Sequence, residues 1–109
     1  MQLPHHHLHA YQLSLEWLKL VHATQIRDAD QRCQARKSAK SAARNLAEGA
    51  GRASRADKAR VYAIARGEVC EACAAVEIAG AIGCARAEDV AAVNAMGKRL
   101  TDMIGRLIG

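Results

Sequence analysis

Positively charged side chains recur at every fourth position between residues 32 and 44. Arg32, Arg36, Lys40 and Arg44 occupy these positions. On an α-helix, residues spaced by four lie one above the other, about 6 Å apart along the axis. Like charges in this arrangement destabilise the helix that carries them. The chemistry open to such a row is electrostatic binding of a polyanion, and the alternative is a solvated face without a ligand.

Four polar residues near the following turn are candidates for an acid–base site. Asn45, Glu48, Arg52 and Arg66 supply an amide, a carboxylate and two guanidinium groups. No nucleophile or histidine accompanies them in the pattern. An amide and a carboxylate beside a helix end commonly bind backbone donors and pair with a guanidinium. We therefore expect these residues to fix a corner between helices, and we expect no catalytic residue.

Metal and nucleotide sites have weaker support. The candidate metal ligands are His5, His6, His7, His9, Cys70 and Cys73. They lack the second ligand pair, at defined spacing, of a structural zinc site. The Gly-Ala-Gly-Arg segment at 49–52 lacks the lysine spacing of a P-loop. We expect no metal and no cofactor.

The basic residues are concentrated in one region of the chain. The net charge is +5, and 11 of the 16 Lys and Arg residues lie between Arg27 and Arg66, a segment with four acids. Regional basicity is typical of a surface that binds nucleic acid, an acidic protein or anionic lipid. No aromatic residue is interleaved with these cations, so contact with a phosphate backbone is favoured over stacking on unpaired bases.

Composition predicts an all-α protein. The chain has 109 residues, no Phe and one Trp, and alanine supplies much of its apolar content. No segment shows the alternation of a β-strand. Helices are predicted at about 7–23, 30–47, 55–81 and 88–108. Their short connections predict an antiparallel up-down-up-down four-helix bundle that forms a single domain over residues 1–109.

Apolar residues with three-four spacing predict the buried face of each helix. The first helix has a main stripe of Leu8, Tyr11, Leu15 and Leu18, and a further stripe of Leu13, Trp17 and Leu20 beside it, so we expect it to be buried over a wide arc. The second helix has Ala35, Ala39, Ala42 and Leu46. The third helix has Tyr62, Ala65, Val69, Ala72, Val76 and Ala79, and the fourth has Val93, Met96, Leu100, Met103 and Leu107. Apolar residues also lie off the main stripes of the first and fourth helices, namely Leu13, Trp17, Leu20, Ile104 and Ile108, so we expect self-association.

Several residues predict where helices begin, end and cross. Asp28 or Asp30 is a suitable N-cap for the second helix, and Ser54 with Asp57 forms a capping pair for the third. Gly49 suits the left-handed position that ends a helix. Gly67, inside the third helix, predicts a close helix crossing, because glycine is otherwise unfavourable there.

The chain lacks the marks of membrane insertion or export. No run reaches the roughly 18 apolar residues of a membrane span, and the N-terminus lacks the pattern of a signal peptide. We therefore expect a cytoplasmic protein with no membrane partner. In that reducing compartment Cys33, Cys70, Cys73 and Cys84 are expected to be free thiols.

A longer motif resembles a known family. It comprises Asn45-Leu46-Ala47-Glu48-Gly49, Gly51-Arg52-Ala53-Ser54, Asp57-Lys58, Ile64-Ala65-Arg66-Gly67-Glu68 and Glu71, preceded by Asp30-Gln31-Arg32 and Tyr11-Gln12. These residues resemble the signature of a bacterial four-helix-bundle family whose founding members are encoded in intervening sequences within 23S ribosomal RNA genes. The resemblance covers nearly the whole chain.

The resemblance implies a left-handed antiparallel bundle that assembles into a homo-oligomeric ring, most often a pentamer, with no assigned enzymatic activity. It also implies a distant relationship to the accessory variability determinant (Avd) of diversity-generating retroelements, a basic pentamer that works with a reverse transcriptase and its template RNA. The loop between the first two helices is shorter than is usual in the family. The second helix is richer in Lys and Arg, which favours a member that binds anions.

Taken together, the sequence predicts a non-catalytic accessory protein that binds RNA or DNA, in the setting of a retroelement reverse transcriptase. The predicted nucleic-acid-binding residues are Arg32, Arg36, Lys37, Lys40, Arg44, Arg52, Arg55 and Lys58. The predicted structural corner consists of Asn45, Glu48, Gly49, Gly51, Arg66 and Gly67. The alternative is an oligomeric scaffold that binds a protein partner and no nucleic acid.

Overall fold

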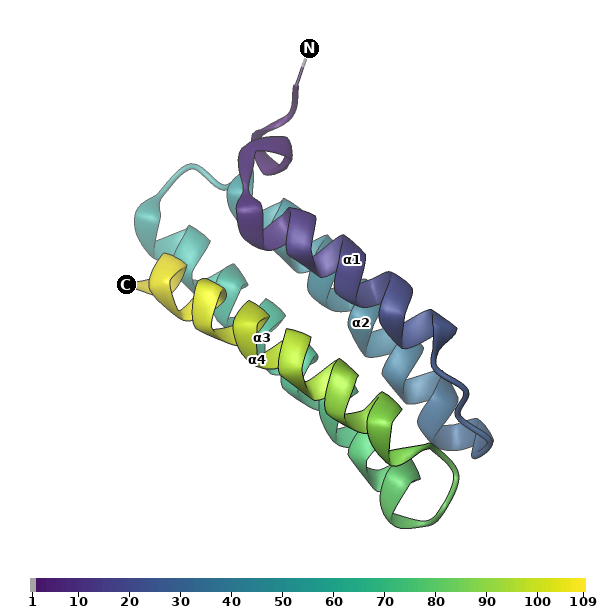
Figure 1. Cartoon of the computed structure of the whole chain (residues 1–109). Coiled ribbons are helices and arrows are strands. Elements are labelled where there is room, and N and C mark those ends of the chain that lie inside the picture. Colours follow the sequence, from purple (N-terminus) through teal and green to yellow (C-terminus); the bar gives the residue numbers. More distant parts are fainter. Residues whose placement is uncertain (1) are drawn as a thin grey trace.

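Four α-helices make up most of the protein in a computed structural model, which describes residues 2–109 (Figure 1). A short 3-10 helix, η1, spans Pro4–His7. The α-helices are α1 (His9–Ala23), α2 (Ala29–Ala50), α3 (Arg55–Ala81) and α4 (Ala87–Ile108). The described residues contain no β-strand, so the predicted all-α class is confirmed. The fold is compact, with extents of 44 × 26 × 21 Å.

Each helix packs on two others. α1 lies against α2 and α4, and α3 lies against the same two helices. The α1–α2 and α3–α4 connections lie at one end of the molecule and the α2–α3 connection at the other (Figure 1). A backbone hydrogen bond from Arg27 N–H to the Cys84 carbonyl, 2.8 Å, ties the first two connections together.

The predicted caps of α2 and α3 are present. Asp28 accepts a hydrogen bond from the Gln31 N–H at 2.9 Å, and Ser54 accepts one from the Asp57 N–H at 3.0 Å. Each cap binds one of the backbone donors that the first helical turn leaves without a partner. Beyond α3, Gly83 adopts φ +79°, a left-handed conformation that favours glycine.

The α2–α3 interface is built from small side chains. Ala35, Ala39 and Ala42 of α2 have no exposed surface, and neither has Leu46. The six predicted core residues of α3 are also buried. Methyl-sized side chains allow two helix backbones to approach closely and still fill the space between them. The predicted inner faces of both helices are therefore confirmed.

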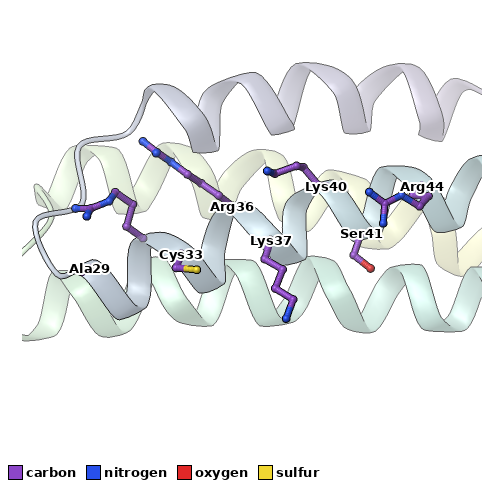
Figure 2. Close-up of a pocket in the computed structure, with 8 residues that line it drawn as sticks. Ala29, Cys33, Arg36, Lys37, Lys40, Ser41 and Arg44 are labelled. Carbon is purple, nitrogen blue, oxygen red and sulfur yellow. The ribbon is translucent and has the colours of Figure 1, made fainter.

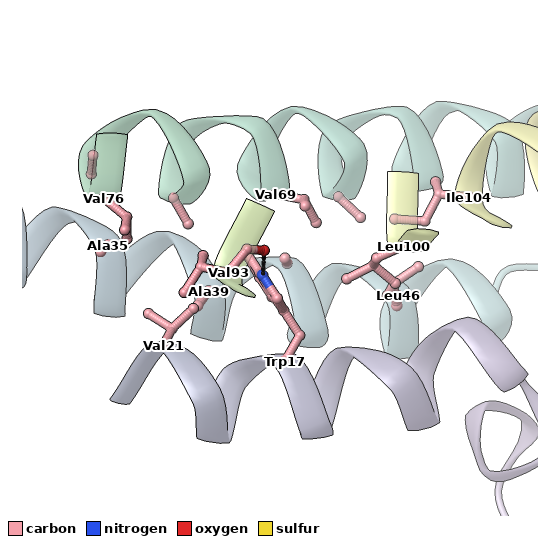
Figure 3. Close-up of a cluster of buried hydrophobic side chains, with 14 of the residues drawn as sticks. Trp17, Val21, Ala35, Ala39, Leu46, Val69, Val76, Val93, Leu100 and Ile104 are labelled. Carbon is pink, nitrogen blue, oxygen red and sulfur yellow. Dashed lines mark hydrogen bonds between the residues drawn. The ribbon is translucent and has the colours of Figure 1, made fainter. Parts of the chain in front are cut away.

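The centre of the core is Trp17, which is fully buried (Figure 3). Its indole N–H donates to the Val93 carbonyl of α4 at 3.3 Å. Gly97 makes room for the ring and for α3, since a Cβ there would lie 2.5 Å from Cys73 Sγ and 3.5 Å from Trp17 Nε1. The indole thus determines which face of α1 points inward.

The predicted main stripe of α1 therefore lies at the edge of the core, and Trp17 of the further stripe lies at its centre. The buried residues of α1 are Ala10, Ser14, Trp17 and Val21, whereas the leucines of the predicted stripe are only partly buried. In α4 the buried positions are Val93, Gly97, Leu100 and Ile104, so Ile104 lies in the core, and the predicted Met96, Met103 and Leu107 lie at its edge or remain exposed.

This rearrangement removes the sequence argument for self-association. Trp17 and Ile104, which were expected off the main stripes, have no exposed surface. Leu13, Leu20 and Ile108 are partly buried and pack against the same core. The monomer therefore covers most of the apolar surface that was expected to need a partner.

Gly49 does not end α2, contrary to the prediction. The helix continues to Ala50 and its C-cap is Gly51, at φ −85°, while Gly49 has no positive φ. The reason for a glycine at position 49 is contact with α3, because a Cβ there would lie 2.7 Å from the Tyr62 ring. The close crossing expected at Gly67 is therefore at Gly49, since Gly67 is exposed and has no atom within 4 Å of a built Cβ.

Charged side chains brace the corner between α2 and α3. Arg52 forms ion pairs with Glu48 and, at 3.2 Å, with Asp57. Arg60 pairs with the same Asp57 at 3.1 Å. Lys58 Nζ donates to the Ala50 carbonyl at the end of α2, 2.6 Å away. Glu48 therefore has the structural role that was expected of it, with Arg52 as its partner.

Two predicted corner residues contact other parts of the chain. The Asn45 amide donates to the Ser41 carbonyl, 3.0 Å away and one turn earlier in α2, instead of binding donors at the corner. Arg66 is exposed on α3 and lies near Gly105 of α4. A guanidinium about three turns into α3 is too far along the helix to reach the corner, which Arg52 already occupies.

Gly49 and Gly67 differ in the space around them, and this difference gives a first prediction, on stability. Gly67→Ala should raise the free energy of unfolding by about 0.5–1 kcal/mol, because alanine has the better helix propensity and the site is open. Gly49→Ala should lower it by about 1–3 kcal/mol, because the added methyl group overlaps the buried Tyr62 ring. Urea denaturation followed by circular dichroism measures both. Equal stabilisation by the two changes would show that the Gly49 contact is not tight.

The braced corner gives a second prediction, on pH. The hydrogen bond from Arg60, together with the charge of Arg52, lowers the pKa of Asp57. A carboxyl whose pKa is lower in the folded state stabilises the fold above its unfolded pKa and loses that effect as the pH falls through the folded value. Asp57→Asn should therefore lower the urea midpoint at neutral pH, and the difference from the wild type should shrink below about pH 3.9.

Asp102→Asn is a matched control for this prediction, since Asp102 is paired with Lys98 on α4, away from the corner. If the urea midpoint of Asp57→Asn stayed below that of the wild type by the same amount from neutral to acid pH, the carboxylate charge would not be what stabilises the corner.

Candidate nucleic-acid interface

A shallow groove of about 610 Å³ runs along the outer face of α2 (Figure 2). All of its lining residues come from this one helix. They are Ala29, Arg32, Cys33, Arg36, Lys37, Lys40, Ser41 and Arg44. The groove therefore contains the four cations of the repeating row and Lys37, and we call these five residues the α2 cation row.

The periodicity of α2 places these cations outside. Positions 35, 39, 42 and 46 point into the core, and positions 32, 36, 40 and 44 follow the same repeat on another part of the helix surface. The inner face of α2 is alanine apart from Leu46, so α2 buries little side-chain volume. The five cations of the row line the groove instead.

Two of the arginines are held in place by backbone carbonyls, one in α1 and one in the connection that follows it. Arg32 Nη1 donates to the Ile26 carbonyl of the α1–α2 connection at 2.9 Å, and Arg36 Nη2 donates to the His22 carbonyl of α1 at 3.3 Å. The His22 carbonyl is in the last turn of α1, where carbonyls lack intrahelical partners and carry the negative end of the helix dipole, so it binds a guanidinium group well. Arg36 Nε is buried and has no partner.

The other three cations of the row, Lys37, Lys40 and Arg44, are less restrained. In Figure 2, Lys40 extends toward the same side of α2 as Arg36, and Lys37 extends toward the other side. Lys37 lies beside a second small groove between α2 and α3, where Glu68 and Glu71 form part of the wall. Among the described residues, no carboxylate is within ion-pair distance of any member of the α2 cation row.

The absence of such pairs does not support the alternative interpretation, in which these charges form a solvated face with local ion pairs. A solvated face with local pairs would include Asp28 with Arg32, but the described structure pairs Asp28 with the Gln31 N–H and Arg32 with the Ile26 carbonyl. Two of the five cations of the row, Arg32 and Arg36, are thus held by neutral carbonyl groups, and among the described residues none of the five forms an ion pair with an acid.

The three remaining predicted binding residues lie apart from the groove. Arg52 and Lys58 are engaged at the α2–α3 corner by carboxylates and a carbonyl, as described above. Arg55, at the start of α3, lies near the C-terminal Gly109. The structure therefore brings together five of the eight predicted residues on one surface.

The sequence pattern missed the neutral residues of the groove. Ala29, Cys33 and Ser41 lie beside the cations, and with Lys37 they form a second row with the same spacing of four. That repeat was visible in the sequence, but its residue types did not suggest a role. The anchoring carbonyls of His22 and Ile26 had no sequence signal, because their position depends on how the α1–α2 connection folds back.

The four cysteines are free thiols in the structure. Cys33 is exposed in the groove, and Cys70 is exposed on α3. Cys73 packs against Gly97, and burial, with smaller effects from Cys70 and Glu77, raises its pKa to about 11. This thiol is therefore protonated and weakly nucleophilic at neutral pH.

Within residues 2–109, no group of three or more His, Cys, Asp or Glu side chains is arranged to hold a metal ion. Over the same residues, none of the helices combines the length and the apolar character needed to cross a lipid bilayer.

Comparison with known proteins gives one informative match. The sequence model of the 23S rRNA-intervening sequence protein family matches residues 7–106, which include all of α2, α3 and the corner between them. No curated protein matches the chain significantly. The matched region covers almost the entire chain and contains the motif on which the resemblance was based. The chain belongs to the 23S rRNA-intervening sequence protein family.

Proposed function

We propose that this protein is a non-catalytic nucleic-acid-binding protein that holds the phosphate backbone of RNA, or of DNA, in the α2 groove. The observation that carries the proposal is the α2 cation row: five cations on one open helix face with no carboxylate partner among the described residues. The family match supports RNA as the first candidate, because its name refers to a ribosomal RNA.

Binding would be electrostatic and nearly independent of base sequence. Lys and Arg side chains that neutralise phosphates release condensed counterions, so affinity falls steeply with salt. No aromatic side chain lines the groove to stack on a base. Contacts to phosphates position a protein on nucleic acid but carry no sequence information directly.

A binding role also fits the residue types of the groove better than catalysis does. Its lining residues are cations, a thiol, a serine and an alanine. None of these lining residues is a histidine or a carboxylate that could exchange a proton with a substrate near neutral pH.

Reversing two charges in the row tests the proposal. Arg36→Glu combined with Lys40→Glu should lower affinity for a structured RNA at least a hundredfold at low salt, because two phosphate contacts become repulsions. Fluorescence anisotropy measures binding, and circular dichroism checks helicity. The matched control is Arg99→Glu with Arg106→Glu, two exposed arginines on α4, a helix that does not contact α2. Equal losses in the two double variants would point to net charge and contradict a site on α2.

We further propose that the helices form an antiparallel up-down-up-down bundle and that copies of it associate through the outer face of α3. The short connections and the alternating ends at which they lie support the bundle. Ile64 and Ile78 on α3 and Ile82, its C-cap, remain 45, 49 and 58% exposed, which is unusual for isoleucine. A ring, a pentamer and a reverse-transcriptase partner remain predictions from the family resemblance.

The mass in solution tests association. Light scattering should give a multiple of 11.7 kDa, the mass of one chain. Ile78→Asp with Ile82→Asp should reduce it to a single chain, because two charges on a contact face cannot be buried without partners. Leu3→Asp, at an exposed apolar residue outside the α-helices, is the control. A wild-type mass near 11.7 kDa would contradict the oligomer. It would also leave the isoleucine face as a candidate surface for a different protein, in keeping with the scaffold alternative.

A further inference from the structure

We infer that the α2 groove binds one nucleic-acid strand at a time, over about five phosphates, with the bases directed away from the protein. This inference rests on the proposed function, and it adds the footprint, the number of strands and the end of the groove that binds most tightly.

The spacing of the positive charges along the α2 cation row favours a single strand. Arg32 and Arg44 are separated by twelve residues, so the α2 cation row spans about 18 Å of helix axis. The five cations are separated by four intervals, so neighbouring charges lie on average about 4.5 Å apart along the axis. A nucleic-acid strand carries one phosphate per about 3.4 Å of duplex axis, and the two strands together carry one per about 1.7 Å. The charge density of the row is therefore close to that of one strand and less than half that of a duplex.

Acidic side chains of α3 lie beside the groove and also favour a single strand. On the α3 side, beyond Lys37, Glu68 and Glu71 line the neighbouring groove. Their carboxylates would repel a second row of phosphates placed next to the first. The acidic edge of α3 thus limits the favourable surface to the width of a single strand.

The residues that line the groove favour an orientation in which the bases point away from the protein. Its neutral residues are Ala29, Cys33 and Ser41, none of which offers an aromatic face or a planar amide to a base. The cations provide charge for phosphates, and no neutral residue of the groove provides a stacking surface or an amide for a base, so we place the bases of a bound strand toward solvent. They remain free to pair with a complementary strand.

The two ends of the groove differ in how firmly their cations are held. Arg32 and Arg36 each donate one hydrogen bond to a backbone carbonyl, that of Ile26 in the α1–α2 connection and that of His22 in α1. A guanidinium has five donors, so each keeps others for phosphate. Lys40 and Arg44 have no side-chain hydrogen bond among the described residues. Ordering a mobile side chain opposes binding, so the anchored end should contribute more to affinity.

The test measures the salt dependence of binding with two labelled probes. The first is an oligouridylate of about six nucleotides, matched to the expected footprint, and the second is an RNA hairpin whose stem is longer than the groove. For five phosphates on a single strand, log affinity should fall with log salt with a slope of about −3.5, or roughly a hundredfold between 50 and 200 mM. An oligocytidylate of the same length should bind within a few-fold of the oligouridylate.

Single substitutions locate the contacts. Arg36→Gln and Lys40→Gln should each reduce the slope by about one, whereas Arg99→Gln on α4 should leave it unchanged. Changes that keep the charge separate the two ends of the groove. Arg36→Lys should weaken binding several-fold, because lysine lacks the planar guanidinium group that the His22 carbonyl holds in place. Lys40→Arg should not weaken binding.

The outcomes distinguish failure of the inference from failure of the proposed function. If neither probe binds at 50 mM salt, the proposed function itself is wrong. If the hairpin alone binds, or if its slope is about twice that of the oligouridylate, two strands are contacted and the one-strand inference is wrong. Equal effects of Arg36→Lys and Lys40→Arg would overturn the difference between the two ends.

Discussion

The packing of α2 against α3 through alanine methyl groups is the interaction on which the rest of the structure depends. Alanine side chains let the two backbones approach closely, but each contributes little buried area, so the helix is held by proximity along its whole length. A larger residue at any of these positions would separate the helices. The same arrangement leaves the cations of the α2 row outside the core, where they line the groove.

The cations near α2 fall into two groups with different surroundings. At the corner, Arg52 and Lys58 are used by the fold itself, because Glu48, Asp57 and the Ala50 carbonyl bind them. Along the groove, Arg32 and Arg36 rest on neutral carbonyls and keep their charge available. A carboxylate partner neutralises a cation, whereas a carbonyl partner orients it. Sequence motifs place both groups close together, but only the three-dimensional contacts show which cations can meet a ligand.

The sequence predicted the helical class, the inner faces of α2 and α3 and the caps at Asp28 and Ser54, since these follow from local periodicity and local hydrogen bonding. It failed where two apolar stripes competed on one helix. In α1 the leucine stripe has more residues, but Trp17 has the largest side chain, and volume decided the orientation. The roles of Gly49 and Gly67 could not be separated, because a glycine at a crossing and one in open solvent look alike in the sequence. The cation row was predicted, but the carbonyls that orient two of its members were not.

The burial of Trp17 has a practical consequence for solution work. The chain has one tryptophan, so its tryptophan emission comes from a single place, where the indole N–H meets the Val93 carbonyl between α1 and α4. Emission from this site reports whether those two helices are docked, without any label or competing fluorophore of its kind. Since the ring lies in the interior and the groove is on the outer face of α2, this signal follows integrity of the fold separately from occupancy of the charged surface.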